Sequence, residues 1–289
     1  MCDQDHSHSH THTHVHEHPG EAAHSHTHAH PHAHPIIEIR DLYYAYPDGT
    51  RALCGINLDI YEGDSVALVG PSGVGKSTLI KHLNGILEGH GEILVDGLSV
   101  IPENYTKIRA NIGMVFQDPD DQLFCPTLYE DVAFGPGNME MEEDGIQARV
   151  KEALGKMGLL ELMDRPPHNL SFGQCKRAAM ATVLSMMPRI MVFDEPTSNL
   201  DPKNEAIMSQ IIRELPCTKI IISHDLPILY QICNKVAIMR EGRIERVIPM
   251  DDFITDSALL CDNGLDFTFK CECCNDPYFH RSIVNPDAG

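Results

Sequence analysis

The sequence predicts an α/β fold with a largely parallel core sheet, because short apolar runs alternate with longer stretches of helical character. The apolar runs are typical of buried strands and lie at residues 65–69, 93–95, 112–116, 190–193, 220–223 and 236–239. The helical stretches lie at residues 77–84, 147–157, 171–187 and 204–215. Nearer the N-terminus, residues 37–39 and 56–60 alternate between apolar and polar side chains, which predicts strands with one buried face.

The globular part of the chain is expected to span residues 36–250, with a helix-rich region at about 118–186. Residues 1–35 are of low complexity and hold thirteen of the 18 histidines, mostly at every second position. This tail has no apolar pattern from which a core could form, so we expect it to be disordered. The pattern weakens again over residues 251–289, which we interpret as a C-terminal extension.

Composition excludes some classes of function. The 289 residues carry a formal net charge of −20, whereas a nucleic-acid binder usually shows a basic stripe, so we expect no nucleic-acid partner. No apolar run approaches the roughly 20 residues that a membrane-spanning helix needs. No secretory signal is apparent, and we expect the 10 cysteines to be reduced in the cytoplasm. A role at a membrane would therefore need separate membrane partners.

A phosphate-binding loop follows the first buried strand. The segment Gly70-Pro-Ser-Gly-Val-Gly-Lys-Ser77 matches the pattern G-x-x-x-x-G-K-[ST] in full, between an apolar strand and a helix. In such a loop, glycines let successive backbone N–H groups turn towards phosphate oxygens. We expect Lys76 to reach the β- and γ-phosphates of ATP and the Ser77 hydroxyl to ligate Mg²⁺. The residues expected to bind nucleotide here are Gly70, Pro71, Ser72, Gly73, Val74, Gly75, Lys76, Ser77 and Thr78.

Two acidic residues follow a second apolar strand. Residues 190–193 are apolar and run directly into Asp194 and Glu195. Open α/β sheets bind ligands at the carboxyl ends of their strands, which is where this pair would lie. We expect Asp194 to hold Mg²⁺, directly or through water, and Glu195 to act as general base on the attacking water.

The segment Leu170-Ser-Phe-Gly-Gln174 opens a predicted helix. Ser171 suits the N-cap of that helix. The same position would also direct a hydroxyl, a glycine N–H and the helix dipole at a phosphate. The segment by itself favours the N-cap interpretation.

The order of these motifs resembles the ABC ATPase family over roughly residues 36–250. The phosphate loop is followed by Gln117 after a strand, by residues 170–174, by Asp194-Glu195, by residues 198–201 and by His224 after another strand. The resemblance implies the P-loop NTPase fold of this family, with a largely parallel core sheet, an N-terminal antiparallel β subdomain and an α-helical subdomain. The sequence departs from the family pattern at Phe172, where a glycine is usual, and at Cys175, where a polar residue is more usual.

The resemblance also implies roles for individual residues. Family members form head-to-tail dimers, in which each ATP lies between one subunit's phosphate loop and the other subunit's Ser171, Gly173 and Gln174. Gln117 would sense the γ-phosphate and Mg²⁺, and Asp201 would lie in the loop that crosses the interface. The implied catalytic residues are Glu195, His224 and Gln117, and the implied Mg²⁺ ligands are Ser77, Gln117 and Asp194.

An aromatic residue is implied to stack on adenine. Tyr46 is the expected residue, and Tyr43 and Tyr44 are alternatives, because three tyrosines crowd this stretch.

A narrower resemblance points to importers of the energy-coupling-factor type. Residues 116–124, 126–127 and 130–136 are similar to the ATPases of these importers, as is the pair Lys176-Arg177 after the 170–174 segment. The chain includes both halves of the composite ATP site, which favours a homodimer over a heterodimer, and we expect it at the cytoplasmic face of the cell membrane. Its partners would be a transmembrane coupling subunit and a substrate-specific membrane subunit. Importers of this type carry vitamins or the metals cobalt and nickel.

The histidines of the tail favour a metal as the substrate. Neutral imidazole binds Ni²⁺, Co²⁺ and Zn²⁺, and alternating histidines on a flexible chain can satisfy several coordination geometries. The candidate ligands are His6, His8, His10, His12, His14, His16, His18, His24, His26, His28, His30, His32 and His34. We therefore expect an ATPase that powers nickel or cobalt import.

Alternatives remain open. The same ATPase could drive a vitamin importer with an incidental tail, or the chain could be a soluble metal-storage or metal-sensing protein switched by ATP. Cys271, Cys273 and Cys274, with His280 nearby, could form a zinc site, although their spacing lacks the usual C-x₂₋₄-C pair.

Overall fold

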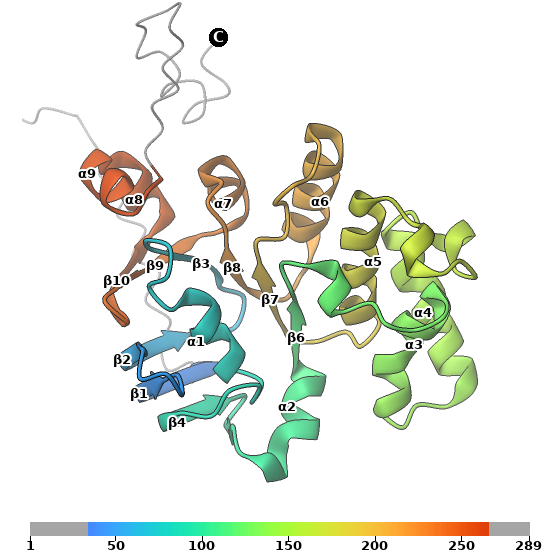
Figure 1. Cartoon of the computed structure of the whole chain (residues 1–289), viewed down its shortest axis with the longest axis horizontal. Helices are drawn as coiled ribbons and strands as arrows, with labels where there is room; N and C mark the ends of the chain where they lie inside the picture. The colour runs from blue at the N-terminus through green and yellow to red at the C-terminus, as the bar shows by residue number, and fades with distance from the viewer. Residues whose placement is uncertain (1–33, 266–289) are drawn as a thin grey trace, which may run out of the picture. The chain divides into compact units, whose positions relative to one another are not determined.

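The structure is a computed structural model that describes residues 34–265 (Figure 1). The chain divides into two units, residues 1–33 and residues 34–289, and every element described here belongs to the second unit. Two sheets organise that unit, one of six strands and one of four. The predicted α/β fold with a parallel core sheet and an antiparallel β subdomain is confirmed.

The six-stranded sheet has the order β10-β9-β3-β8-β7-β6. Its strands are β3 (Ser65–Val69), β6 (Ile112–Val115), β7 (Ile190–Asp194), β8 (Thr218–Ile222), β9 (Lys235–Arg240) and β10 (Arg243–Pro249). The strands from β9 to β6 pair in parallel, and β10 pairs antiparallel with β9 at the edge. β3 is thus central, between β8 and β9, which come more than a hundred residues later in the chain.

The four-stranded sheet is antiparallel, in the order β2-β1-β4-β5. Its strands are β1 (Ile37–Ala45), β2 (Arg51–Ile60), β4 (His90–Val95) and β5 (Leu98–Ser99). It packs on one face of the parallel sheet together with α1 (Lys76–His82) and α2 (Tyr105–Asn111). Because successive side chains of a strand point to opposite faces, Val66 and Leu68 of β3 join this core, whereas Ala67 and Val69 join another.

Helices cover the other face of the parallel sheet. They are α3 (Leu128–Asn138), α4 (Glu143–Lys156), α5 (Phe172–Leu184), α6 (Pro202–Glu214) and α7 (Leu226–Ile232). The described part of the chain also has four short 3₁₀ turns. η1 (Pro102–Asn104) precedes α2, η2 (Pro119–Asp121) precedes α3, and η3 (Leu160–Leu162) and η4 (Pro167–Asn169) lie between α4 and α5. All elements between residues 118 and 186 are helical, and α3, α4 and α5 contact one another at the β6 edge of the sheet (Figure 1).

The packed core continues beyond residue 250. The helices α8 (Met250–Thr255) and α9 (Ser257–Asp262) follow β10, and α8 contacts β9 and β10. Met250, Phe253 and Leu260 are buried in the same apolar cluster as α6 and α7. The first part of the C-terminal extension is therefore folded against the core of the parallel sheet.

Candidate functional site

The sequence-predicted site residues gather at one edge of the parallel sheet. Gly70 follows β3, Asp194 ends β7, and His224 comes two residues after β8. Gln117 comes two residues after β6. Because β3, β8, β7 and β6 are parallel neighbours, their carboxyl ends meet at this edge, where open α/β sheets bind ligands.

The backbone of the phosphate loop requires glycine at two positions. Gly70 and Gly75 have φ angles of 150° and 107°, in the region that side chains disfavour. A Cβ atom on Gly70 would lie 2.2 Å from the carbonyl oxygen of Met239, and one on Gly75 would lie 2.5 Å from that of Ala52. The loop is therefore held tightly against β9 and β2, with no room for side chains at these two residues.

Lys76 and Thr78 connect the loop to its surroundings. The buried ammonium of Lys76 donates hydrogen bonds to the carbonyl oxygens of Gly70 (2.7 Å) and Pro71 (3.0 Å). Burial lowers the pKa of Lys76, and the nearby Glu195 and Asp194 act in the opposite direction. The hydroxyl groups of Thr78 and Tyr46 lie 2.8 Å apart.

The three tyrosines near the loop have different surroundings. Tyr46 is exposed and contacts Thr78. The ring of Tyr44 packs edge-on against buried His82, with 4.8 Å between ring centroids. Tyr43 is exposed, and its ring lies against Gly55 of β2. Tyr46 is thus the one of the three that the structure links to the phosphate loop.

Glu195 occupies an unusual backbone conformation at the end of β7. Its φ angle is 48°, in the left-handed region, which costs a residue other than glycine about 1–3 kcal/mol. Its N–H donates to the carbonyl of Ile222 at 2.9 Å, and its Oε1 lies 3.4 Å from Nε2 of His224. The surrounding structure must therefore stabilise this conformation.

Burial and neighbouring charges shift the pKa of the Glu195 carboxyl group. Burial raises its pKa above the ordinary value for glutamate, and the charge of Asp194 acts in the same direction. His224 and Lys76 oppose this effect by favouring the carboxylate. A carboxylate with a raised pKa is better suited to accept a proton from water near neutral pH.

Gln117 is exposed, and its backbone is tied to a helix. The buried ammonium of Lys176 on α5 donates to the carbonyl oxygens of Gln117 (2.7 Å) and Glu195 (3.0 Å) and to the hydroxyl of Ser198 (3.3 Å). These residues follow β6 and β7. The sequence singles out Lys176 only by its position after residues 170–174, and no pattern there identifies its partners.

Ser171, Gly173, Gln174 and Asp201 form a separate group. Ser171 and Gln174 make a capping box at the start of α5, so the expected N-cap is observed. A Cβ atom on Gly173 would lie 2.8 Å from the side chain of Asn204, and Asp201 caps α6 by accepting from the N–H of Asn204 at 3.1 Å. Within residues 34–265, no hydrogen bond or ion pair joins this group to residues 70–78. α5 and α1 also stand apart in Figure 1.

The residues present fit ATP and Mg²⁺. The tight glycine loop exposes Pro71, Ser72 and Gly73 at the sheet edge, beside the buried cation of Lys76. The candidate Mg²⁺ ligands Ser77, Gln117 and Asp194 offer a hydroxyl, an amide and a carboxylate, the oxygen donors that Mg²⁺ prefers.

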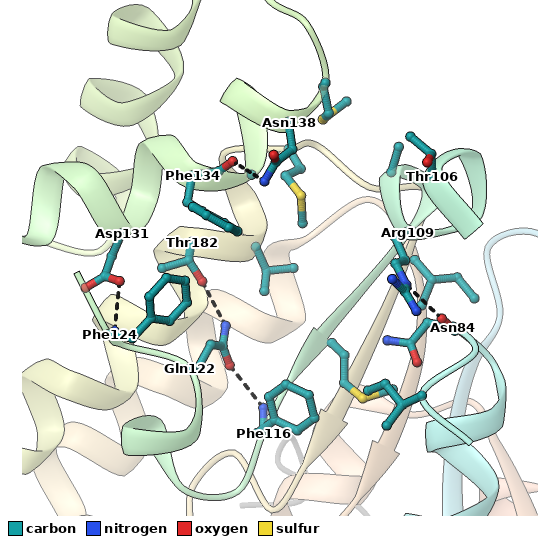
Figure 2. A pocket seen from close by; sticks show the side chains of 18 residues that line it. Asn84, Thr106, Arg109, Phe116, Gln122, Phe124, Asp131, Phe134, Asn138 and Thr182 are labelled. Carbon is teal, nitrogen blue, oxygen red and sulfur yellow. Dashed lines mark hydrogen bonds between the residues drawn. The ribbon is translucent and has the colours of Figure 1, made fainter. Parts of the chain in front are cut away.

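A groove that sequence reasoning did not foresee lies at the edge strand β6. It measures about 620 Å³ and is bounded by residues of α2, β6, α3 and α5 (Figure 2). Phe124 and Phe134 meet edge-to-face at its wall and remain 66% and 54% exposed. Gln122 connects the groove to α5, because its side-chain amide donates to the carbonyl of Ala179 at 2.7 Å.

The candidate transition-metal ligands fall largely outside the described residues. The tail histidines before residue 34 and the cysteines at 271, 273 and 274 lie there, while His34 is described and exposed. Among residues 34–265, no group of three or more metal-binding side chains is assembled. In the same part of the chain, none of the helices combines the length and the apolar character needed to cross a membrane.

Comparisons with known proteins agree with this geometry. The family described as ABC transporter matches residues 53–198. A putative ABC transporter ATP-binding protein of Streptomyces coelicolor is 45% identical over 234 residues, covering 81% of this chain and 90% of that protein. The energy-coupling factor transporter ATP-binding protein EcfA of Methanothermobacter thermautotrophicus is 48% identical over 215 residues, covering 72% of this chain and 69% of that protein.

Solved structures share the fold. CbiO1 from Clostridium perfringens, described as part of the ABC transporter complex CbiONQ, is 41% identical with a TM-score of 0.69, covering 81% of this chain and 96% of that one. The ATP-binding cassette MJ0796, described as a dimer in a post-hydrolysis state bound to ADP and Pi, is 27% identical with a TM-score of 0.67. The match covers 74% of this chain and 99% of the MJ0796 chain.

Proposed function

The chain belongs to the ABC transporter family of ATP-hydrolysing proteins and resembles energy-coupling-factor subunits, and on this premise we propose that it powers the import of nickel or cobalt. The observation that carries the choice of metal is the tail, with thirteen histidines within residues 1–35. Imidazole is a ligand for both metals. The likeness to EcfA and to CbiO1 supports a transporter of the energy-coupling type.

The site geometry supports specific roles in hydrolysis. Glu195 acts as general base on water, because its pKa is raised and His224 lies 3.4 Å away to orient it. Lys76 and the loop N–H groups bind the phosphates. Ser77, Gln117 and Asp194 hold Mg²⁺, which neutralises charge on the phosphate oxygens when bound. Tyr46 stacks on the adenine beside Thr78.

The separation of the two residue groups supports a composite site. Ser171, Gly173 and Gln174 lie on α5, away from the phosphate loop of the same chain, so they would reach ATP across a head-to-tail dimer. Asp201 caps α6 beside them and would contact the partner subunit. Since one chain carries both halves, a homodimer is sufficient.

The groove supports docking of a membrane partner. Exposed Phe124 and Phe134 offer an apolar surface to a helix of a transmembrane coupling subunit, beside the polar side chain of Gln122. A substrate-specific membrane subunit would complete the importer. In this arrangement the chain is a peripheral protein on the cytoplasmic face of the cell membrane.

Metal titration tests the proposal. Calorimetric titration with Ni²⁺, Co²⁺ and Zn²⁺ compares the full chain with a variant whose thirteen tail histidines are all changed to glutamine. Binding that disappears in the variant, together with a fall in nickel or cobalt accumulation by cells, is the expected result. If neither form binds metal, the tail is incidental and a vitamin importer is favoured.

A second experiment distinguishes a transporter subunit from a soluble metal-binding protein. The full chain is purified from membranes with and without the paired substitution of Phe124 and Phe134 by aspartate. Co-purification of a transmembrane protein with the wild type and its loss in the variant supports the transporter. A chain that binds metal and never associates with a membrane protein would instead be a store or a sensor.

A further inference from the structure

Lys176 stands out as a buried cation to which no role in the site has been given above. It lies on α5, two residues beyond the 171–174 segment, and it is 1% exposed. Burying an unpaired ammonium group is costly, so such a group needs acceptors for its protons. Lys176 has three: the carbonyl oxygens of Gln117 and Glu195 and the hydroxyl of Ser198. An ammonium has three N–H donors, and this one uses all of them.

The acceptors come from two segments. Gln117 follows β6, whereas Glu195 and Ser198 both lie in the loop that leads from β7 to Asp201 and α6. The ammonium also lies 5.8 Å from the ring centroid of Phe172, within the 171–174 segment. One side chain therefore contacts the segments that follow β6 and β7 and also the 171–174 segment. The first two would face the γ-phosphate bound to the same chain, and the third would face the ATP of the partner subunit.

The contact with Glu195 explains how its backbone is held. The Glu195 carbonyl accepts from Nζ of Lys176 (3.0 Å), from the Ser198 hydroxyl (2.9 Å) and from the Ser198 N–H (3.2 Å). The Glu195 N–H is fixed on the other side by Ile222. Hydrogen bonds from a charged donor are stronger than those between neutral groups, so the bond from Lys176 is the strongest of the three that hold the carbonyl of this residue, whose φ is 48°.

We propose that Lys176 is a positioning residue for hydrolysis, which keeps the Glu195 carboxylate beside His224 by clamping the Glu195 carbonyl to Gln117 and to α5. This inference rests on the proposed roles of Glu195 and Gln117. If the clamp is released, Glu195 can relax to an ordinary φ angle, and its side chain turns away from the attacking water. Because α5 also carries the 171–174 segment and contacts Gln122, a shift of this helix changes the position of the base.

The experiment compares steady-state ATP hydrolysis by the full chain and by Lys176→Met. Methionine has a similar length and no charge, so it removes the clamp with little change in volume. Lys219→Met is the matched control, since Lys219 is also buried and also donates to carbonyl oxygens, those of Leu215 and Cys217, at the amino end of β8. We expect Lys176→Met to lower kcat about 10- to 100-fold, as misplaced catalytic groups do. KM for ATP should stay within about twofold of wild type, because ground-state binding is unaffected.

A second variant keeps the test decisive if Lys176→Met does not fold. Ser198→Ala removes one acceptor of Lys176 and one donor to Glu195 with almost no change in volume. It should lower kcat by about 3- to 10-fold at unchanged KM. A kcat of Lys176→Met equal to that of Lys219→Met overturns the inference, as does a rise in KM that accounts for the whole loss. If Lys176→Met is unfolded, an unchanged kcat in Ser198→Ala overturns it.

Activity of Glu195→Gln distinguishes failure of the positioning role of Lys176 from failure of the proposed function. Wild-type turnover by Glu195→Gln would remove Glu195 from its role, and the inference with it. An inactive Glu195→Gln together with a fully active Lys176→Met would reject only the positioning role of Lys176.

Discussion

Nε2 of His224 lies 3.4 Å from Oε1 of Glu195, and the two residues follow neighbouring parallel strands, β8 and β7. The imidazole is about half exposed, whereas the carboxylate is largely buried. A half-exposed histidine thus reaches over a largely buried carboxylate at the sheet edge, and separate substitutions can test the two side chains.

Glu195→Gln should abolish turnover and leave ATP binding intact. The amide keeps the size of the side chain but cannot accept a proton from water, and the phosphate loop is untouched. Loss of a general base costs about 10²- to 10⁴-fold in rate. Hydrolysis is measured by phosphate release and binding by calorimetry. Loss of binding in this variant would contradict the assignment of Glu195 as a base.

His224→Ala should shift the acidic limb of the kcat profile to higher pH. Burial raises the pKa of Glu195, and His224 opposes that rise. A base must be deprotonated to act, so activity falls as the pH drops through this pKa. Without His224 the pKa rises further, and the fall begins at a higher pH. If kcat falls at the same pH in His224→Ala as in wild type, His224 does not shift the pKa of Glu195. This holds even if the maximal kcat of the variant is lower.

Gly75→Ala should destabilise the chain by about 1–3 kcal/mol and weaken ATP binding. Its φ is 107°, and the new Cβ would meet the carbonyl oxygen of Ala52. Gly155→Ala is the control. Gly155 lies in α4, and a Cβ atom there would meet no neighbouring atom of residues 34–265 within 4 Å.

Gly155→Ala should stabilise the chain by about 0.5–1 kcal/mol through the lower entropy of its unfolded state. Urea unfolding measures both variants. Equal effects of the two substitutions would mean that the loop conformation is not strained as described.

His82→Leu should make stability less sensitive to acid. His82 is 1% exposed, its Nδ1 lies 2.8 Å from the carbonyl of Thr78, and Nε2 has no partner in the described part of the chain. Burial lowers its pKa below 6.5. A group with a lowered folded pKa contributes stability above the unfolded pKa, and this is lost as the pH falls through the folded pKa.

Unfolding in urea at about pH 7.5 and about pH 5.5 measures the effect. The fall in unfolding free energy between the two should be smaller for His82→Leu than for wild type. His168→Leu, at an exposed histidine, controls for the loss of an imidazole. An equal fall in all three proteins would contradict a neutral buried His82.

Much of the fold follows from local patterns. The strand at 65–69 and the strand at 190–194 are continuous apolar runs because both faces of the parallel sheet are covered. The helix α7 is not predicted, since it is short, has a proline as its second residue and is buried on most sides, which removes the amphipathic period. α3 contains Gly135, Pro136 and Gly137 near its end, residues that normally argue against a helix.

The chemistry of the site is predictable where one segment carries it, as in the phosphate loop. Contacts between segments that are distant in the sequence are not predictable in this way. The acceptors of Lys176 lie 59, 19 and 22 residues away in sequence, so no local pattern indicates them. The groove beside β6 likewise depends on α2, α3 and α5 meeting in space. The tail histidines, apart from His34, lie outside residues 34–265, and their metal-binding role stays a prediction.

The central place of β3 has a consequence for how the chain is made. Ser65, Val66 and Ala67 pair with β8, and residues 66–69 pair with β9, so both neighbours of β3 emerge from the ribosome long after it. Contacts between residues distant in sequence form late and slowly. Until β8 is synthesised the apolar β3 has two open edges, and until β9 is complete at Arg240 it has one, so the nascent chain is prone to aggregate. A nonsense mutation before Thr218 would therefore yield an insoluble fragment, even though every residue of the phosphate loop is present.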